Sequence, residues 1–348
     1  MLDQRIVLTG MGHFHPPHPI PNEFFDSLGI ASAAQWISER TGINNRFSVL
    51  PPAELRALGS EEGSYCKRQQ QGDLPSMASM SCAPWQMALT RAGLGEDFQP
   101  DVLISGSSVP DMDIPANAAL IAKHLQLLRP LVFDVNSACS SFVTNLQVAA
   151  SLLQTTVYKS VAIFNIERYT LRLNYSDRSS CVLFGDGASC ALLQKSPRGA
   201  VELQGLELLD CQLRSDPQGA DLVHIPVMGH FSQQGARVQK FAITKTCEIS
   251  NELLQAHQLT AGELSYFVAH QANLRMLESA AERLGFTRAQ HLFNVDHYGN
   301  QGAAGAPAVL SQNWERFKEG ERVLVAVVGS GLTWGGALLQ FCGLPILL

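Results

Sequence analysis

The chain has 348 residues, 46% hydrophobic and 16% charged, a composition that supports a large buried core and argues against a disordered protein. Its formal net charge of −6 argues against bulk nucleic-acid binding, which needs clustered positive charge. Its eight cysteines form no CxxC pair, so we expect neither a zinc site nor a disulfide framework. The first residues carry no signal-peptide pattern and no apolar run reaches about 20 residues, so we expect a cytoplasmic protein without a membrane span.

The first third of the chain alternates strand and helix patterns. We expect strands over residues 5–9 and 101–106, a helix ending at Gly42, and helices over 75–92 and 115–125. Residues 54–74 are the least apolar segment, and we expect a solvated loop or a lid there. His13, His15 and His18 lie among prolines with no carboxylate or cysteine beside them, which favours a surface loop over a metal site.

The rest of the chain continues the alternation. Strands are expected over 131–135, 160–166, 264–270, 293–296, 322–328 and 337–341, and helices over 143–153, 241–258 and 273–284. Residues 198–235 read as strand-rich but irregular, and residues 181–193 as two strands hinged at the Gly-Asp-Gly of 185–187. This order is typical of a layered α/β protein.

A faint internal repeat indicates that the chain has two related halves. The strand before Cys139 and its turn resemble residues 293–300, and residues 102–106 resemble 267–270, both at an offset of roughly 160 residues. We therefore predict halves of 1–195 and 196–348. If they superimpose, Cys139, His270 and Asn300 all lie at the ends of equivalent strands, where a cleft between the halves can gather them.

Cys139 is the leading candidate for a nucleophile. It lies in a turn between the strand of 131–135 and the helix of 143–153, where unpaired backbone N–H groups and the helix dipole favour an anion. Such a thiol is expected to ionise more easily, and the thiolate is the reactive form. The alternative is that Cys139 is only a small buried hydrophobic residue.

Four motifs, in order, resemble one family. They are Asn136-Ser137-Ala138-Cys139-Ser140-Ser141-Phe142, His270-Gln271-Ala272-Asn273-Leu274-Arg275, Tyr298-Gly299-Asn300 and Gly329-Ser330-Gly331-Leu332-Thr333-Trp334-Gly335. Together with residues 36–43 and 184–187, they resemble 3-oxoacyl-(acyl-carrier-protein) synthase III of the thiolase superfamily. The resemblance extends from Gly10 to the last strand. It implies a five-layered αβαβα fold of two βαβαβαββ halves, and a homodimer.

The resemblance also implies a reaction and a role for each motif. Cys139 would take an acyl group from acyl-CoA, and His270 and Asn300 would hold the enolate that a malonyl thioester forms on losing carbon dioxide. The amide of Cys139 and one in the turn of Ser330 and Gly331 would hold the oxyanion. The malonyl carrier would be acyl carrier protein or coenzyme A, and neither a cofactor nor a metal is implied.

Further positions match the family's binding residues. Trp36, Arg40 and Arg178 match residues that hold the coenzyme A nucleotide, and Lys240 and Arg275 match residues that meet the acidic carrier protein. The acyl pocket would include Ile114 and Phe142. Ile114 stands where the family often has a bulky aromatic residue, so a longer, medium-chain acyl group is an option.

Two other activities share parts of this pattern. The order Cys, His, Asn also occurs in papain-like proteases, but the Cys-Gly-x-Cys-Trp context of that family is missing here. A thiolase-fold acyltransferase that acts on an alcohol or amine without condensation is the second alternative. Relatives of that kind often lose the asparagine or the histidine, and this chain keeps both, so condensation is favoured. An inactive scaffolding subunit would not be expected to retain Cys139.

Overall fold

One mixed sheet forms the centre of the molecule. In the computed structural model, which describes residues 4–30, 33–60, 64–155, 157–197, 203–227 and 229–343, its strands are β1 Gln4–Phe14, β4 Val102–Gly106, β5 Leu131–Asp134, β6 Ser160–Arg168, β7 Asp186–Pro197, β8 Gly205–Ser215, β11 Tyr266–Ala269, β12 Arg322–Gly329 and β13 Thr333–Cys342. Two small sheets pair β2 His18–Pro21 with β3 Asn45–Ser48, and β9 Val223–His224 with β10 Ser232–Gln233.

Helices cover the sheet and fill its centre. They are α1 Asn22–Asp26, α2 Ala34–Thr41, α3 Pro52–Ser60, α4 Ser64–Gln71, α5 Cys82–Ala92, α6 Asn117–His124, α7 Ser141–Thr155, α8 Gly235–Ala256, α9 Leu274–Leu284, α10 Val295–Tyr298 and α11 Gly305–Gln312. Short 3₁₀ turns are η1 Ala78–Ser81, η2 Tyr169–Arg172, η3 Pro217–Leu222, η4 Ala261–Glu263, η5 Gly302–Ala304 and η6 Trp314–Arg316. Among the described residues, no helix has the length and apolar character needed to cross a membrane.

The two ends of the sheet repeat one strand order. The first half reads β5-β4-β6-β7-β1 and the second reads β11-β12-β13-β8, and the halves join where β1 pairs with β8. In the first half β4 is parallel to β6, and β6 is antiparallel to β7. In the second half β11 is likewise parallel to β12, and β12 is antiparallel to β13. A single bridge from Phe267 to His291 stands where β5 stands in the first half. This repetition agrees with the predicted duplication; the boundary at residue 195 falls near the end of β7 and stays a prediction.

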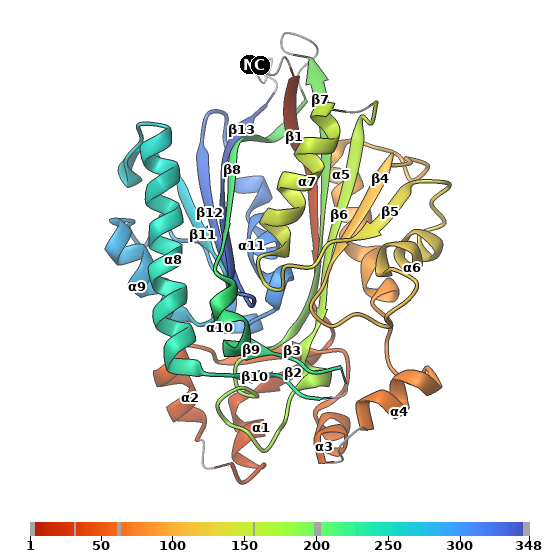
Figure 1. Cartoon of the computed structure of the whole chain (residues 1–348), viewed down its shortest axis with the longest axis vertical. Helices are drawn as coiled ribbons and strands as arrows, with labels where there is room; N and C mark the ends of the chain where they lie inside the picture. The colour runs from red at the N-terminus through yellow and green to blue at the C-terminus, as the bar shows by residue number, and fades with distance from the viewer. Residues whose placement is uncertain are drawn as a thin grey trace.

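Three apolar cores match an arrangement of five layers. α7 and α11 lie in the middle, between the two halves of the sheet, with α8 and α9 on one outer side and α5 and α6 on the other (Figure 1). The middle core includes Phe142 and Leu146 of α7 and Val309 of α11, none of which has exposed surface. The apolar residues of α7 lie on its buried side: Phe142, Val143, Leu146, Ala149, Ala150 and Leu153 are buried, whereas Ser151 and Gln154 are exposed.

The structure corrects several sequence-based expectations. Residues 54–74 are not a loop, because α3 and α4 occupy most of the segment and Leu55 and Leu58 of α3 are buried in the first core. Residues 293–296 are not a strand, because the helix α10 begins at Val295. Residues 181–183 form a turn, Phe184 makes only an isolated bridge to Asn300, and β7 starts at Asp186, so no strand hairpin forms there.

The histidine segment is also more ordered than a surface loop. β1 extends to Phe14, and a ring nitrogen of His13 lies 2.8 Å from the Ser311 hydroxyl. His15 stacks on Tyr298 with ring centroids 3.5 Å apart, and its two nitrogens contact the side-chain amides of Gln301 and Gln312. The segment therefore supports the loop that carries Asn300.

Candidate active site

Cys139 lies on a tight turn immediately before α7. Ala138 has the left-handed φ of 51°, and the Ser140 and Ser141 N–H groups donate to the carbonyls of Ser137 and Ala138 at 3.2 and 3.0 Å. The left-handed residue bends the chain sharply, so that the half-buried Cys139 precedes the first turn of the helix. Partial positive charge at that helix end favours a negative oxygen or sulfur nearby.

His270 follows β11 directly. Its backbone N–H donates to the Ala326 carbonyl of β12 at 2.8 Å, which fixes its position at the end of the strand. Burial lowers the pKa of His270 to about 4, so the imidazole is neutral at neutral pH. Its buried Nδ1 has no hydrogen-bond partner among the described residues, and no carboxylate charges the ring. A neutral imidazole can donate a hydrogen bond to a substrate oxygen.

Asn300 is held by the backbone of residues 183–185. Its N–H donates to the Leu183 carbonyl at 2.8 Å, and its carbonyl accepts from the Gly185 N–H at 3.0 Å. The side-chain oxygen Oδ1 accepts the N–H of Gly302 at 2.9 Å. With the oxygen occupied, the amide nitrogen is the part of this side chain that remains for a substrate.

One cavity of about 350 Å³ joins most of the predicted site residues. Those that line it are Trp36, Arg40, Cys139, Arg178, His270, Asn300 and Ser330. Elements from both halves of the chain thus contribute to a single site. The side chain of Arg178 lies over the ring of Trp36, with its guanidinium carbon 5.0 Å from the ring centroid.

The turn between β12 and β13 packs directly against the Cys139 turn. A Cβ atom on Gly329 would lie 2.7 Å from the Ser137 carbonyl oxygen, so only glycine permits this approach. The Thr333 hydroxyl lies 2.5 Å from the Ser140 hydroxyl and donates to the Ser137 carbonyl at 3.2 Å. This close packing brings the predicted oxyanion residues of the two turns next to each other.

The thiol of Cys139 is not the easily ionised group expected from the sequence. Burial, followed by the nearby Glu167, raises the pKa of Cys139 to about 12, while a hydrogen bond with Tyr169 acts in the opposite direction. Burial likewise raises the pKa of Glu167 to about 8. Cys139 is therefore a neutral thiol in the resting site, and its proton must leave as the sulfur reacts.

Sequence reasoning missed an aromatic wall of this cavity. Tyr169, Phe184 and Phe231 line it together, with the Tyr169 and Phe184 rings stacked at 4.6 Å. One signal was present in the sequence. Tyr169 directly follows β6, which belongs to the same parallel set as β5 and β4, and the carboxyl ends of parallel strands meet at one edge of a sheet.

Five predicted residues do not line the cavity, and one of them, Gly331, lies between Ser330 and Leu332, which do. Phe142 has no exposed surface and packs in the middle core, whereas Ile114 is 85% exposed, so a single chain brings neither into an acyl pocket with Cys139. Lys240 and Arg275 are exposed on α8 and α9, two helices whose other residues line the cavity. The Arg275 guanidinium contacts the Glu278 carboxylate at 3.0 Å.

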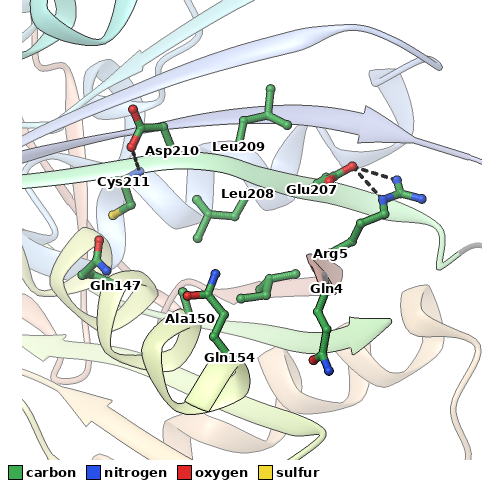
Figure 2. A pocket seen from close by; sticks show the side chains of 11 residues that line it. Gln4, Arg5, Gln147, Ala150, Gln154, Glu207, Leu208, Leu209, Asp210 and Cys211 are labelled. Atoms are coloured by element: carbon green, nitrogen blue, oxygen red, sulfur yellow. Dashed lines mark hydrogen bonds and ion pairs between the residues drawn. The ribbon is translucent and has the colours of Figure 1, made fainter. Parts of the chain in front are cut away.

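A second cavity near β1, β8 and α7 does not suit catalysis. Its charged groups are already paired, Arg5 with Glu207 at 2.8 Å (Figure 2) and Asp210 with His257, outside the cavity lining, at 3.0 Å. Burial raises the pKa of its Cys211 to about 12. Within the described ranges, no three His, Cys, Asp or Glu side chains gather closely enough to hold a metal ion.

Comparisons with known proteins point to the same chemistry. The family profile of 3-oxoacyl-(acyl-carrier-protein) synthase III matches residues 133–217, and its C-terminal profile matches 254–341. A beta-ketoacyl-(acyl-carrier-protein) synthase III from Synechocystis is 32% identical over 353 residues, covering 98% of this chain and 99% of the relative. One from Rhodospirillum centenum is 30% identical over 346 residues, covering 97% and 99%. The crystal structure of the synthase III from Aquifex aeolicus superimposes with a TM-score of 0.83 at 25% identity, covering 97% of this chain and all of that one.

Proposed function

Because the chain belongs to the 3-oxoacyl-(acyl-carrier-protein) synthase III family of acyltransferases, we propose that it condenses an acyl-CoA with a malonyl thioester and releases carbon dioxide. The observation that carries this proposal is the single cavity that joins Cys139, His270 and Asn300. A nucleophile and two neutral hydrogen-bond donors are what a decarboxylative condensation needs. We propose fatty-acid synthesis or a related secondary pathway as its setting.

In the first half-reaction, the sulfur of Cys139 attacks the carbonyl carbon of the acyl-CoA. A tetrahedral oxyanion forms and collapses, the bond to the coenzyme A sulfur breaks, and the Cys139 proton leaves with the coenzyme A thiol. The amide of Cys139 and an amide of the turn at Ser330 and Gly331 stabilise the oxyanion. The product is an acyl thioester on Cys139, and the position of Cys139 before α7 favours the negative charge that develops.

In the second half-reaction, the malonyl group loses carbon dioxide and its thioester carbonyl becomes an enolate. His270 and Asn300 donate hydrogen bonds to the enolate oxygen, and because both are neutral they do so without a cofactor or a metal. The enolate carbon attacks the acyl carbonyl and expels the Cys139 sulfur, which takes up a proton. One 3-oxoacyl thioester, one carbon dioxide and the free thiol result.

The mouth of the cavity supports binding of a nucleotide carrier. Trp36 offers an aromatic face for adenine, and Arg40 and Arg178 offer positive charge for phosphates. Lys240 and Arg275 lie on the neighbouring helices α8 and α9, where they can meet the acidic surface of acyl carrier protein. We favour malonyl-acyl carrier protein as the second substrate, and malonyl-CoA is the alternative.

We propose a homodimer located in the cytoplasm, and the edge of the sheet supports the dimer. β5 is the last strand of its half, and Met112, Ile114, Leu128 and Leu131, from β5 and the segments before it, are exposed by 43% or more. An apolar strand edge of this kind is usually covered. Since Ile114 lies outside its own cavity, it can reach an acyl group only in a second copy of the chain.

Mass spectrometry and carbon dioxide release test the reaction. An acyl-CoA should add its acyl mass to the protein; Cys139→Ala should abolish the adduct, and Cys211→Ala, in the second cavity, should keep it. The Asn300→Ala variant should still form the acyl adduct on Cys139, but it should no longer release carbon dioxide from a malonyl thioester.

The same assays separate the competing activities. Acylation of Cys139 without any release of carbon dioxide by the intact enzyme would refute condensation and leave acyl transfer to an alcohol or amine. None of the relatives compared supports the protease alternative.

A further inference from the structure

A phenol contacts the reactive sulfur. Tyr169 begins η2, directly after β6, and only 2% of its surface is exposed. Its hydroxyl oxygen lies 3.7 Å from the Cys139 sulfur, within hydrogen-bond range for a sulfur atom. Neither the family motifs nor the proposed roles of His270 and Asn300 assign a function to this hydroxyl.

Three neighbours hold the phenol in place. The Tyr169 ring stacks on Phe184 at 4.6 Å with an angle of 22°, and it meets Phe231 edge-on at 6.0 Å. Behind it lies Gly302, where an added Cβ would come within 2.5 Å of the Tyr169 ring carbon Cε2. The ring therefore fills a slot that depends on glycine at residue 302, and it has little room to swing away from the sulfur.

We propose that the Tyr169 hydroxyl is the group that stabilises the Cys139 thiolate, both when the thiol reacts and when the product leaves. When the sulfur is negative it has no proton to give, so the hydrogen bond between these two atoms can only run from tyrosine to sulfur. Hydrogen bonds to charged groups are the strong ones. The phenol keeps its proton throughout, and burial supports this by raising its pKa well above the usual 10.

The other titratable groups around the sulfur cannot take this role. Glu167, on β6, acts against ionisation of Cys139, as described above. His270 lines the same cavity, but no hydrogen bond joins its ring to the sulfur within the described chain. Ser108 contacts the phenol, and its hydroxyl donates to Glu167 at 3.0 Å and not to the sulfur. Tyr169 is therefore the side-chain donor placed to offset the burial of the thiol.

Alkylation of Cys139 by iodoacetamide measures the thiolate directly. The thiolate sulfur displaces iodide and forms a carbamidomethyl thioether, so the rate at each pH follows the thiolate population. Tyr169→Phe should slow alkylation about 10-fold at a fixed pH and move the rate profile to higher pH by about one unit. Tyr175→Phe is the matched control, because this buried tyrosine donates to the Thr170 carbonyl at 3.0 Å and does not contact Cys139.

Two outcomes would overturn the proposal. Either the Tyr169→Phe profile superimposes on that of the wild type, or Tyr175→Phe shifts it equally. Glu167 and His270 are unchanged in every variant, so the comparison isolates the hydroxyl. If Tyr169→Phe fails to fold, Tyr169→Leu removes the same hydroxyl and is measured instead. The test needs no acyl substrate, so it stays separate from the proposed condensation: an enzyme that releases no carbon dioxide refutes that reaction and leaves this inference intact.

Discussion

Replacing Gly329 by alanine should separate the two turns that meet at Cys139. The new Cβ would lie 2.7 Å from the Ser137 carbonyl oxygen, 2.8 Å from the Ser140 nitrogen and 3.0 Å from the Ser140 hydroxyl. Two of these three atoms belong to the backbone, so a rotamer change cannot relieve the contact. The turns must move apart by several tenths of an ångström. Misplacing a reacting group by about 1 Å can cost about 100-fold, so we expect acylation to slow by about 10- to 100-fold, or roughly 1.4–2.7 kcal/mol.

Single-turnover mass spectrometry measures this effect. Enzyme is mixed with excess acyl-CoA, and the fraction carrying the acyl mass is followed in time, while thermal unfolding shows how much of the protein is folded. Gly262→Ala is the matched control, because Gly262 is exposed and an added Cβ there meets only one atom, at 3.9 Å. If Gly329→Ala acylates within twofold of the wild type while remaining folded, the two turns do not cooperate in this step.

Three further changes probe stability and binding. Asp111→Ala leaves the buried Arg168 without its ion-pair partner and should lower the free energy of unfolding, measured in urea, by about 3–5 kcal/mol. Glu54→Ala breaks the more exposed ion pair with Arg68 and should cost less than about 1 kcal/mol. Burial lowers the pKa of His13 to about 4 and that of His15 to about 3. As the pH drops from about 6.5 towards 4, the unfolded chain therefore binds protons first, and the free energy of unfolding should fall. The double variant with glutamine at both positions should flatten this dependence, and an unchanged slope contradicts the prediction. Trp36→Ala should raise KM for acyl-CoA about 10-fold and leave the rate of malonyl decarboxylation at saturation unchanged. An equal loss in acyl-CoA binding and in decarboxylation would exclude a role of Trp36 in nucleotide stacking.

The repeated strands and the Cys139 turn were predictable because their signals are local. β4, β6 and β12 each contain an apolar run, over residues 102–104, 161–164 and 323–328, and the turn residues of 136–140 separate β5 from the helix α7. The offset of roughly 160 residues relates Cys139 to Asn300 from the sequence alone. Patterns of this kind involve residues that are neighbours in the chain, so a single sequence is enough to recognise them.

Other features depend on contacts that the sequence does not display. The helix α4 is polar along most of its length and is joined to α3 by the ion pair of Arg68 with Glu54 at 2.9 Å, so it gives no apolar period. Residues 293–296 copy a strand of the first half, but in the second half that strand is reduced to the single bridge at His291. The contact of Tyr169 with Cys139 joins different strands, and the pKa of the thiol depends on the burial that results.

The repeated strand order also places the two loops of the proposed site at equivalent positions in the two halves. In the first half, the loop from the third strand position to the central helix α7 carries Cys139, and in the second half the corresponding loop to α11 carries Asn300. In the proposed condensation, the first of these loops holds the electrophile, the acyl group on Cys139, and the second holds the enolate that attacks it. Under these proposed roles neither half alone contains a complete catalyst, and separated halves should recover activity only by reassociating.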